Sequence, residues 1–99
     1  MRCIRWTPQN GDIVRLKRGF DHSFEAIAVR RAGLPLREGA LYEVIRSDGA
    51  PTPVLTLCEV RVVHITGARH VTKVGSEQFS YASDRFESVF KQDTRRGRP

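Results

Sequence analysis

The segment of residues 54–66 is the longest apolar run in the chain, and it limits the folds that the chain can adopt. Most of its aliphatic side chains are branched at the β carbon, which favours an extended strand over a helix. The apolar residues fall on both parities: Val54, Cys58, Val60 and Val62 on one, and Leu55, Leu57, Val63 and Ile65 on the other. The parity changes near Glu59 to Val63, and this predicts a bulge or a sharp bend where a small sheet curls to close.

Shorter alternating segments bounded by turn residues predict the other strands. Residues 12–18 have this pattern. Residues 40–47 follow the Glu38-Gly39 turn and carry apolar groups on both faces. A hairpin turn at residues 66–69 leads into a further strand at 70–74, and residues 89–90 add a last short one. The chain holds ten Val and five Ile against six Leu and seven Ala, so we expect it to be mainly β.

Residues 23–33 predict a short helical insertion between two of these strands. Four residues fall on one helical stripe, namely Phe24, Ile27, Ala28 and Arg31. Asp21 or Ser23 can cap the first turn, and Gly33 can adopt the left-handed conformation that closes a helix. The alternative is a strand, because Glu25, Ile27 and Val29 also fit one face of an extended chain.

Two phrases of the sequence resemble a known group of proteins. The first is Leu34-Pro35-Leu36-Arg37-Glu38-Gly39-Ala40-Leu41-Tyr42-Glu43-Val44, and the second is Tyr81-Ala82-Ser83-Asp84-Arg85-Phe86-Glu87-Ser88-Val89. Both are similar to phrases in small bacterial and phage proteins with a Src-homology-3-like barrel, most of which have no known function. The resemblance implies a Src-homology-3-like barrel and a role without catalysis. The residue pattern itself predicts a small barrel of about five short antiparallel strands with a short helical insertion, and the long span between Gly19 and Gly33 departs from the family.

The charge of +6 is concentrated near the two ends of the chain. Residues 1–31 carry +4, residues 32–90 carry −1 and residues 91–99 carry +3. At 99 residues the chain has the length of one domain, which we expect at 1–90, followed by a basic flexible tail at 91–99. The basic residues that nucleic-acid binding would use are Arg15, Lys17, Arg18, Arg30, Arg31, Arg95 and Arg96.

We find no catalytic, metal-binding or cofactor-binding signature in the sequence. His22, His64 and His70 do not have the paired spacing of a zinc site, although His64 and His70 would form a weak site if they faced each other across the Gly67 turn. Two cysteines are too few for a disulfide framework, and an apolar stretch of membrane-spanning length is absent. We therefore expect a cytoplasmic protein that is not an enzyme and needs no cofactor or metal.

The remaining function is binding, and two classes of partner fit the sequence. Trp6 and Tyr42 predict an aromatic platform for a protein partner, although such rings more often belong to a core. Because the middle of the chain is nearly neutral, we favour a protein–protein adaptor or inhibitor of bacterial or phage type over the alternative of a nucleic-acid binder. Steep loss of affinity with rising salt is the property that distinguishes the alternative.

Overall fold

The computed structural model of the chain describes residues 8–48 and 53–90. Strands account for 48% of these residues and helices for 18%, so the prediction of a mainly β fold is confirmed. The elements follow in the order β1 (Ile13–Leu16), the 3₁₀ helix η1 (Phe20–His22), α1 (Phe24–Arg31), β2 (Leu41–Ser47), β3 (Val54–Ile65), β4 (Ala68–Lys73), β5 (Phe79–Ala82), the 3₁₀ helix η2 (Ser83–Arg85) and β6 (Phe86–Phe90).

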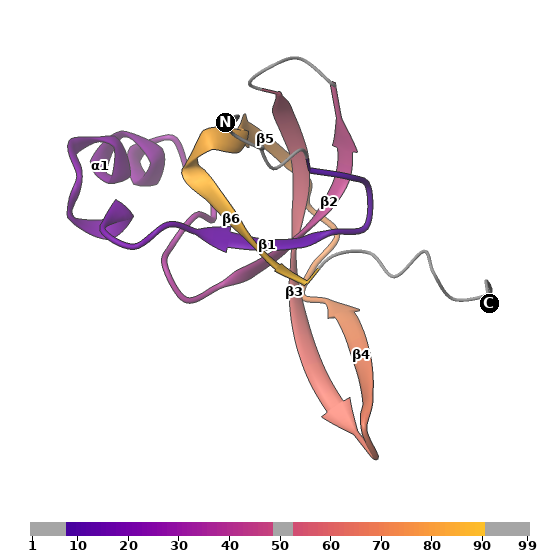
Figure 1. Cartoon of the computed structure of the whole chain (residues 1–99). Coiled ribbons are helices and arrows are strands. Elements are labelled where there is room, and N and C mark those ends of the chain that lie inside the picture. Colours follow the sequence, from indigo (N-terminus) through magenta and orange to yellow (C-terminus); the bar gives the residue numbers. More distant parts are fainter. Residues whose placement is uncertain (1–7, 49–52, 91–99) are drawn as a thin grey trace, which may run out of the picture.

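The strands form one antiparallel sheet in the order β4-β3-β2-β1-β6, and β5 also pairs with β3. The sheet has six strands where the sequence predicted about five, because the chain that returns after β3 pairs with it twice. β4 lies against the far end of β3, and β5 lies against its beginning. Figure 1 shows that the β3–β4 hairpin extends beyond the rest of the sheet, on the opposite side from α1.

Two apolar clusters on opposite faces of β3 explain its change of parity. Leu55 and Leu57 belong to the larger cluster, which also takes in residues of α1 and β6. Cys58 and Val60 point to the other face, where they pack with Ile13 in a smaller cluster. Successive side chains of a strand alternate between its two faces. The odd-numbered apolar residues at the start of β3 therefore enter the larger cluster, and the even-numbered ones further along enter the smaller cluster.

Of the bulge or sharp bend predicted near Glu59 to Val63, the bulge is wrong. β3 pairs with β4 in unbroken register from Val60 to Ile65, and the register shift lies instead in β2, between Val44 and Arg46. The sequence pattern was real, but its cause is the presence of two apolar environments along one strand.

The helix predicted at residues 23–33 is confirmed as α1, and the strand alternative is wrong. The Ser23 side chain accepts a hydrogen bond from the backbone N–H of Ala26 at 3.1 Å, as an N-cap does. Gly33 has a φ of 79°, which is the left-handed conformation of a helix-ending glycine. Asp21 and Glu38 join the start of this insertion to the turn before β2, because each accepts a hydrogen bond from the backbone N–H of the other.

The prediction of Tyr42 as a partner-binding aromatic is wrong, because its ring is completely buried. The ring packs edge-on against Phe79 and Phe86 in the larger cluster. Its hydroxyl donates to the carbonyl of Pro35 at 2.7 Å and accepts from the backbone N–H of Arg37 at 3.1 Å. Burial raises the pKa of Tyr42 above its usual value, and the residue anchors the segment between α1 and β2. Trp6, the other predicted ring, lies outside the described residues.

Candidate functional site

One side of α1 exposes large apolar side chains to solvent. Phe24 is 91% exposed and Ile27 is 47% exposed, although both are of a type that usually lies in a core. Residues three and seven positions apart share one side of a helix, so Arg31 lies beside this pair and is also exposed. We call Phe24, Ile27 and Arg31 the helix face. α1 itself lies to one side of the sheet, at the end of the molecule where Figure 1 labels it.

The opposite side of α1 fixes the orientation of the helix face. Ala26 is fully buried and Val29 is almost so, and both belong to the larger apolar cluster. These two small side chains face the core, which leaves the larger Phe24 and Ile27 on the outside. The sequence places Phe24 and Ile27 on one stripe, but helical periodicity gives the stripe and not the side that is buried.

Polar contacts between α1 and the end of the sheet reinforce this orientation. Glu25 accepts a hydrogen bond from the hydroxyl of Tyr81 on β5, and its other oxygen lies 2.9 Å from the guanidinium of Arg85 in η2. Burial and the neighbouring Glu25 carboxylate raise the pKa of Tyr81 to about 12. On the other flank of the helix, Arg30 pairs with Asp21 at 3.0 Å. The helix face is therefore presented by a helix that is held on both flanks.

The basic residues predicted for nucleic-acid binding do not form one basic surface. Arg15 pairs with Glu87 at 2.6 Å, and Arg30 pairs with Asp21, so each of these cations faces a carboxylate. Arg31 is exposed on the helix face, while Arg95 and Arg96 lie outside the described residues.

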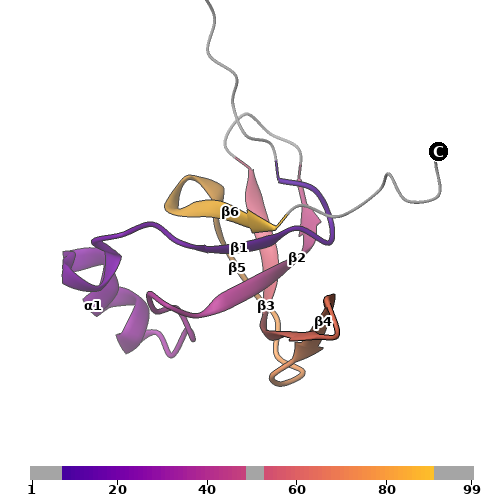
Figure 2. The same ribbon diagram turned by 60° about the horizontal axis from the view of Figure 1, so that its bottom comes forward.

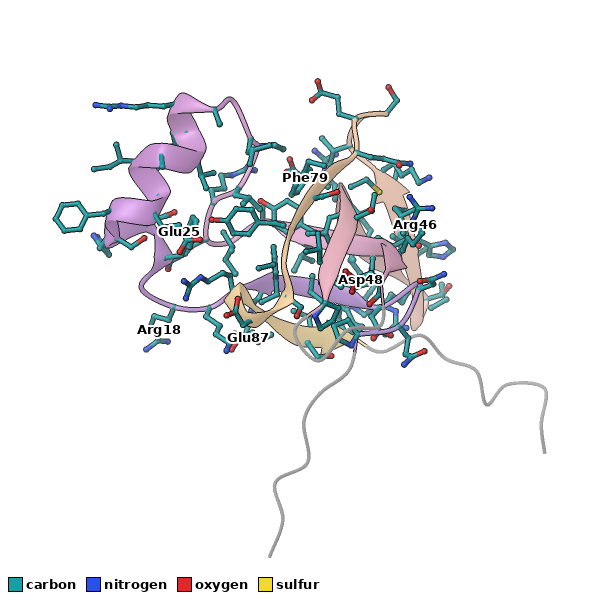
Figure 3. The ribbon with its side chains drawn as sticks, turned by 90° about the horizontal axis from the view of Figure 1, so that it is seen from above. Arg18, Glu25, Arg46, Asp48, Phe79 and Glu87 are labelled. Atoms are coloured by element: carbon teal, nitrogen blue, oxygen red, sulfur yellow. The ribbon has the colours of Figure 1, made fainter. Side chains whose placement is uncertain are left out.

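Lys17 and Arg18 border a shallow groove of about 310 Å³ beside η1. The same groove includes Glu25, Asp84 and Arg85, so its charges are mixed. Figure 3 shows Arg18 at the α1 end of the molecule, with its side chain directed away from the sheet. The two carboxylates offset most of the charge of the three cations, Lys17, Arg18 and Arg85, so the groove is poorly suited to a phosphate backbone.

The residues that could bind metal or act as nucleophiles are dispersed. His64 lies opposite Arg69 and His70 lies opposite Val63, so the two imidazoles point to opposite faces of the hairpin and do not form the weak site considered above. In residues 8–48 and 53–90 we find no group of three or more His, Cys, Asp or Glu side chains that could hold a metal ion. Cys58 is buried, and burial raises its thiol pKa, so the thiolate is disfavoured.

Comparisons with known proteins return no match: no family model, curated protein or solved structure is similar to this chain. The assignment of function therefore depends on the surfaces of the molecule. Among the described residues, no helix has the length and apolar character needed to cross a membrane.

Proposed function

We propose that this chain is a small binding module, without catalytic activity, that uses the helix face to contact a partner protein. The observation that supports this proposal is the 91% exposure of Phe24 on a helix whose opposite side is buried. An exposed aromatic ring beside a second apolar residue is typical of an interaction site. Full burial of a Phe side chain stabilises by about 1.5–3 kcal/mol, which is the size of an interface hot spot.

The chemistry of the helix face defines the partner. Phe24 and Ile27 require an apolar pocket, and Arg31 requires a carboxylate at its rim, because Arg31 has no ion-pair partner within the described residues. The partner is therefore a folded protein with an apolar cleft bordered by acidic groups. We propose that the chain acts on such a partner as an adaptor or inhibitor of bacterial or phage type.

A Src-homology-3-like barrel fits the order of the elements and belongs to the proposal. β1 pairs with both β2 and β6, so the first and last strands of the domain lie side by side. The 3₁₀ helix η2 joins β5 to β6, and α1 lies in the connection between β1 and β2. In such an arrangement the β1–β2 connection is a loop that carries a binding surface on a rigid scaffold.

A pull-down from a nuclease-treated bacterial lysate tests the proposal when it compares three forms of the chain. We expect the wild-type chain to retain a protein that Phe24→Ser loses. The control is Val54→Ser, because Val54 is a 47% exposed apolar side chain on β3, outside the helix face. Retention that is equal for Phe24→Ser and the wild type would remove the helix face from the function.

The nucleic-acid alternative is tested in the same preparation without nuclease. Retained DNA or RNA that is released steeply between 50 and 200 mM salt, and that is lost in Lys17→Glu or Arg18→Glu, would replace the protein-partner proposal. The ion pairs of Arg15 and Arg30 argue against this outcome, because both cations already face carboxylates.

A further inference from the structure

The hairpin of β3 and β4 is a second exposed surface, separate from the helix face. We call residues 60–74 the β3–β4 arm. All six residues of β4 are exposed, and four large apolar side chains of the arm are at least 41% exposed: Val63, Ile65, Val71 and Val74. Figure 2 shows β4 on the far side of the sheet from α1, as does Figure 1.

β4 ends the sheet, and its outer edge is open among the described residues. The backbone N–H of Val74 donates to the carbonyl of Glu59 at 3.0 Å, which makes these two residues a hydrogen-bonded pair. Hydrogen-bonded and non-hydrogen-bonded pairs alternate along antiparallel strands. Thr72, His70 and Ala68 therefore bond towards β3, and the three residues between them direct their backbone groups outward.

The outward-directed residues of β4 are Arg69, Val71 and Lys73. Their N–H and C=O groups provide the hydrogen bonds that an added strand would take up. Their side chains lie on one face of the arm, with a basic residue on each side of an apolar one. On this face the guanidinium of Arg69 lies 4.4 Å from the centre of the Phe90 ring.

The charge of the arm selects among the possible occupants. Residues 60–74 include Arg61, Arg69 and Lys73 and contain no Asp or Glu. A second copy of this strand is disfavoured, because the symmetric register centred on Val71 places Arg69 of each copy opposite Lys73 of the other. Carboxylates opposite the two cations are favourable, since opposite charges across neighbouring strands stabilise the pairing.

A nucleic acid would also use the cations, but it does not match the other groups on the arm. Three cations on fifteen residues are few for a phosphate-binding ribbon, and four exposed aliphatic side chains would have no counterpart on a phosphate backbone. An extended peptide satisfies the open backbone groups, the aliphatic side chains and the cations together.

We propose that the outer edge of β4 binds an extended acidic peptide segment as an added antiparallel strand. Its acidic side chains lie opposite Arg69 and Lys73, and an apolar side chain lies opposite Val71. The segment has the pattern acidic-x-apolar-x-acidic. This site is independent of the helix face and gives the chain a second protein-binding surface at the other end of the molecule.

The test uses a capped peptide of sequence Thr-Glu-Thr-Val-Thr-Glu-Thr and the whole chain, observed by amide NMR. We expect chemical-shift changes at β4 and slower hydrogen exchange, by about tenfold or more, at the amides of Arg69, Val71 and Lys73. Replacing both Glu residues of the peptide by Lys should weaken binding at least tenfold. Equal binding of the Lys peptide, or shift changes confined to α1 or to the Lys17 groove, would overturn the proposal.

N-methylated peptides separate strand addition from simple charge attraction. Methyl groups on the Glu and Val amides remove the N–H groups that face β4, and should abolish binding. Methyl groups on the Thr amides face away and should leave the affinity within about threefold. If both methylated peptides bind as the parent does, the peptide is not an added strand and the proposal fails.

Variants of the chain complete the test. Lys73→Glu should weaken binding of the acidic peptide by about tenfold, while the charge-matched control Arg18→Glu should change it less than twofold. Phe24→Ser should leave peptide binding unchanged, so failure of the helix-face proposal does not affect this result. Dimers whose formation slows hydrogen exchange at the amides of Arg69, Val71 and Lys73, or duplex DNA bound through β4 with steep salt dependence, would assign the edge to another occupant.

Discussion

The helix face and the β3–β4 arm both expose apolar side chains, but they are attached to the sheet in different ways. α1 has a capped first turn, two buried side chains and ion pairs on both flanks. The arm is attached at its base by the smaller apolar cluster, and further out by the contacts of His64 and Arg69 with Phe90. The first surface is preformed and rigid, whereas the second is a ribbon whose open backbone groups are its main chemical feature.

The largest expected effect compares two positions on β3 itself. Leu57 is fully buried in the larger apolar cluster, and Ile65 is 53% exposed at the tip of the arm. We expect Leu57→Ala to lower the free energy of unfolding by about 2–5 kcal/mol. Ile65→Ala should change it by less than about 0.5 kcal/mol, because it creates no cavity. Urea denaturation of both variants measures the difference, and similar losses would show that the arm is packed as tightly as the core.

The next effect concerns the Tyr42 hydroxyl, which anchors the segment between α1 and β2. Tyr42→Phe removes the hydroxyl that bonds Pro35 and Arg37, and leaves the Pro35 carbonyl and the Arg37 N–H without that partner. We expect a loss of about 1–3 kcal/mol in the free energy of unfolding, with the core ring retained. Amide exchange should quicken around residues 35–37 and remain unchanged in β4. A uniform change in both regions would contradict the separate attachment of the two surfaces.

A smaller effect is expected at the start of α1. Ser23→Ala removes the side chain that caps the helix, and should cost about 1 kcal/mol. Ser23→Asp keeps a capping oxygen and serves as the control, with most of that stability retained. Chemical denaturation gives the free energies, and circular dichroism shows whether the helix itself is lost. Equal stability of all three chains would mean that packing of Ala26 and Val29 suffices to hold the helix.

The corresponding contact on the arm should be weaker still. Arg69→Ala removes the cation above the Phe90 ring and should cost about 0.5–1 kcal/mol. Arg61→Ala is the matched control, because Arg61 is also exposed on the arm but lies on its opposite face. Thermal denaturation of the pair measures the difference. A cost for Arg61→Ala as large as that for Arg69→Ala would show that general charge on the arm matters more than the ring contact.

The last predicted effect is a change in stability caused by ionisation of Tyr81, and it is expected only at alkaline pH. The pKa of Tyr81 is raised from 10.0 to about 12 by burial and by Glu25. Between these values the unfolded chain has lost the phenol proton and the folded chain keeps it, so stability should fall as the pH rises from 10 to 12. In a Tyr42→Phe background, ultraviolet titration should give a midpoint near 12, and Glu25→Gln should lower it. An unchanged midpoint would mean that Glu25 does not contribute.

The local pattern of the sequence was sufficient to predict most of the elements. Alternation, the Ser23 cap and the glycine turns predicted β1, α1, β2 and the β3–β4 hairpin near their observed bounds. β5 was missed because residues 76–82 lack clear alternation, and because its pairing with β3 depends on a contact distant in sequence. The bulge was predicted wrongly because a strand that contacts two apolar clusters and a bulged strand that contacts one cluster give the same change of parity.

The candidate surfaces were less accessible to prediction than the fold. Tyr42 was assigned to a partner, but its environment depends on three strands that the sequence does not place together. The charge of residues 32–90 is −1 as a block, which conceals the three cations and absent acids of the arm. A count over each hairpin would have found this local excess. The outward side of α1 could not be found, because it depends on how Ala26 and Val29 meet the sheet.

The buried thiol of Cys58 reports on the separation of β2 and β3. It lies in β3 opposite Glu43 of β2, near the point where β3 leaves β2 and enters the arm. A thiol reagent can reach it only when these strands separate. In a Cys3→Ser chain, the rate at which Cys58 reacts therefore measures how often the strands open. A partner bound to the helix face should leave this reaction rate unchanged, whereas a strand added to β4 should lower it.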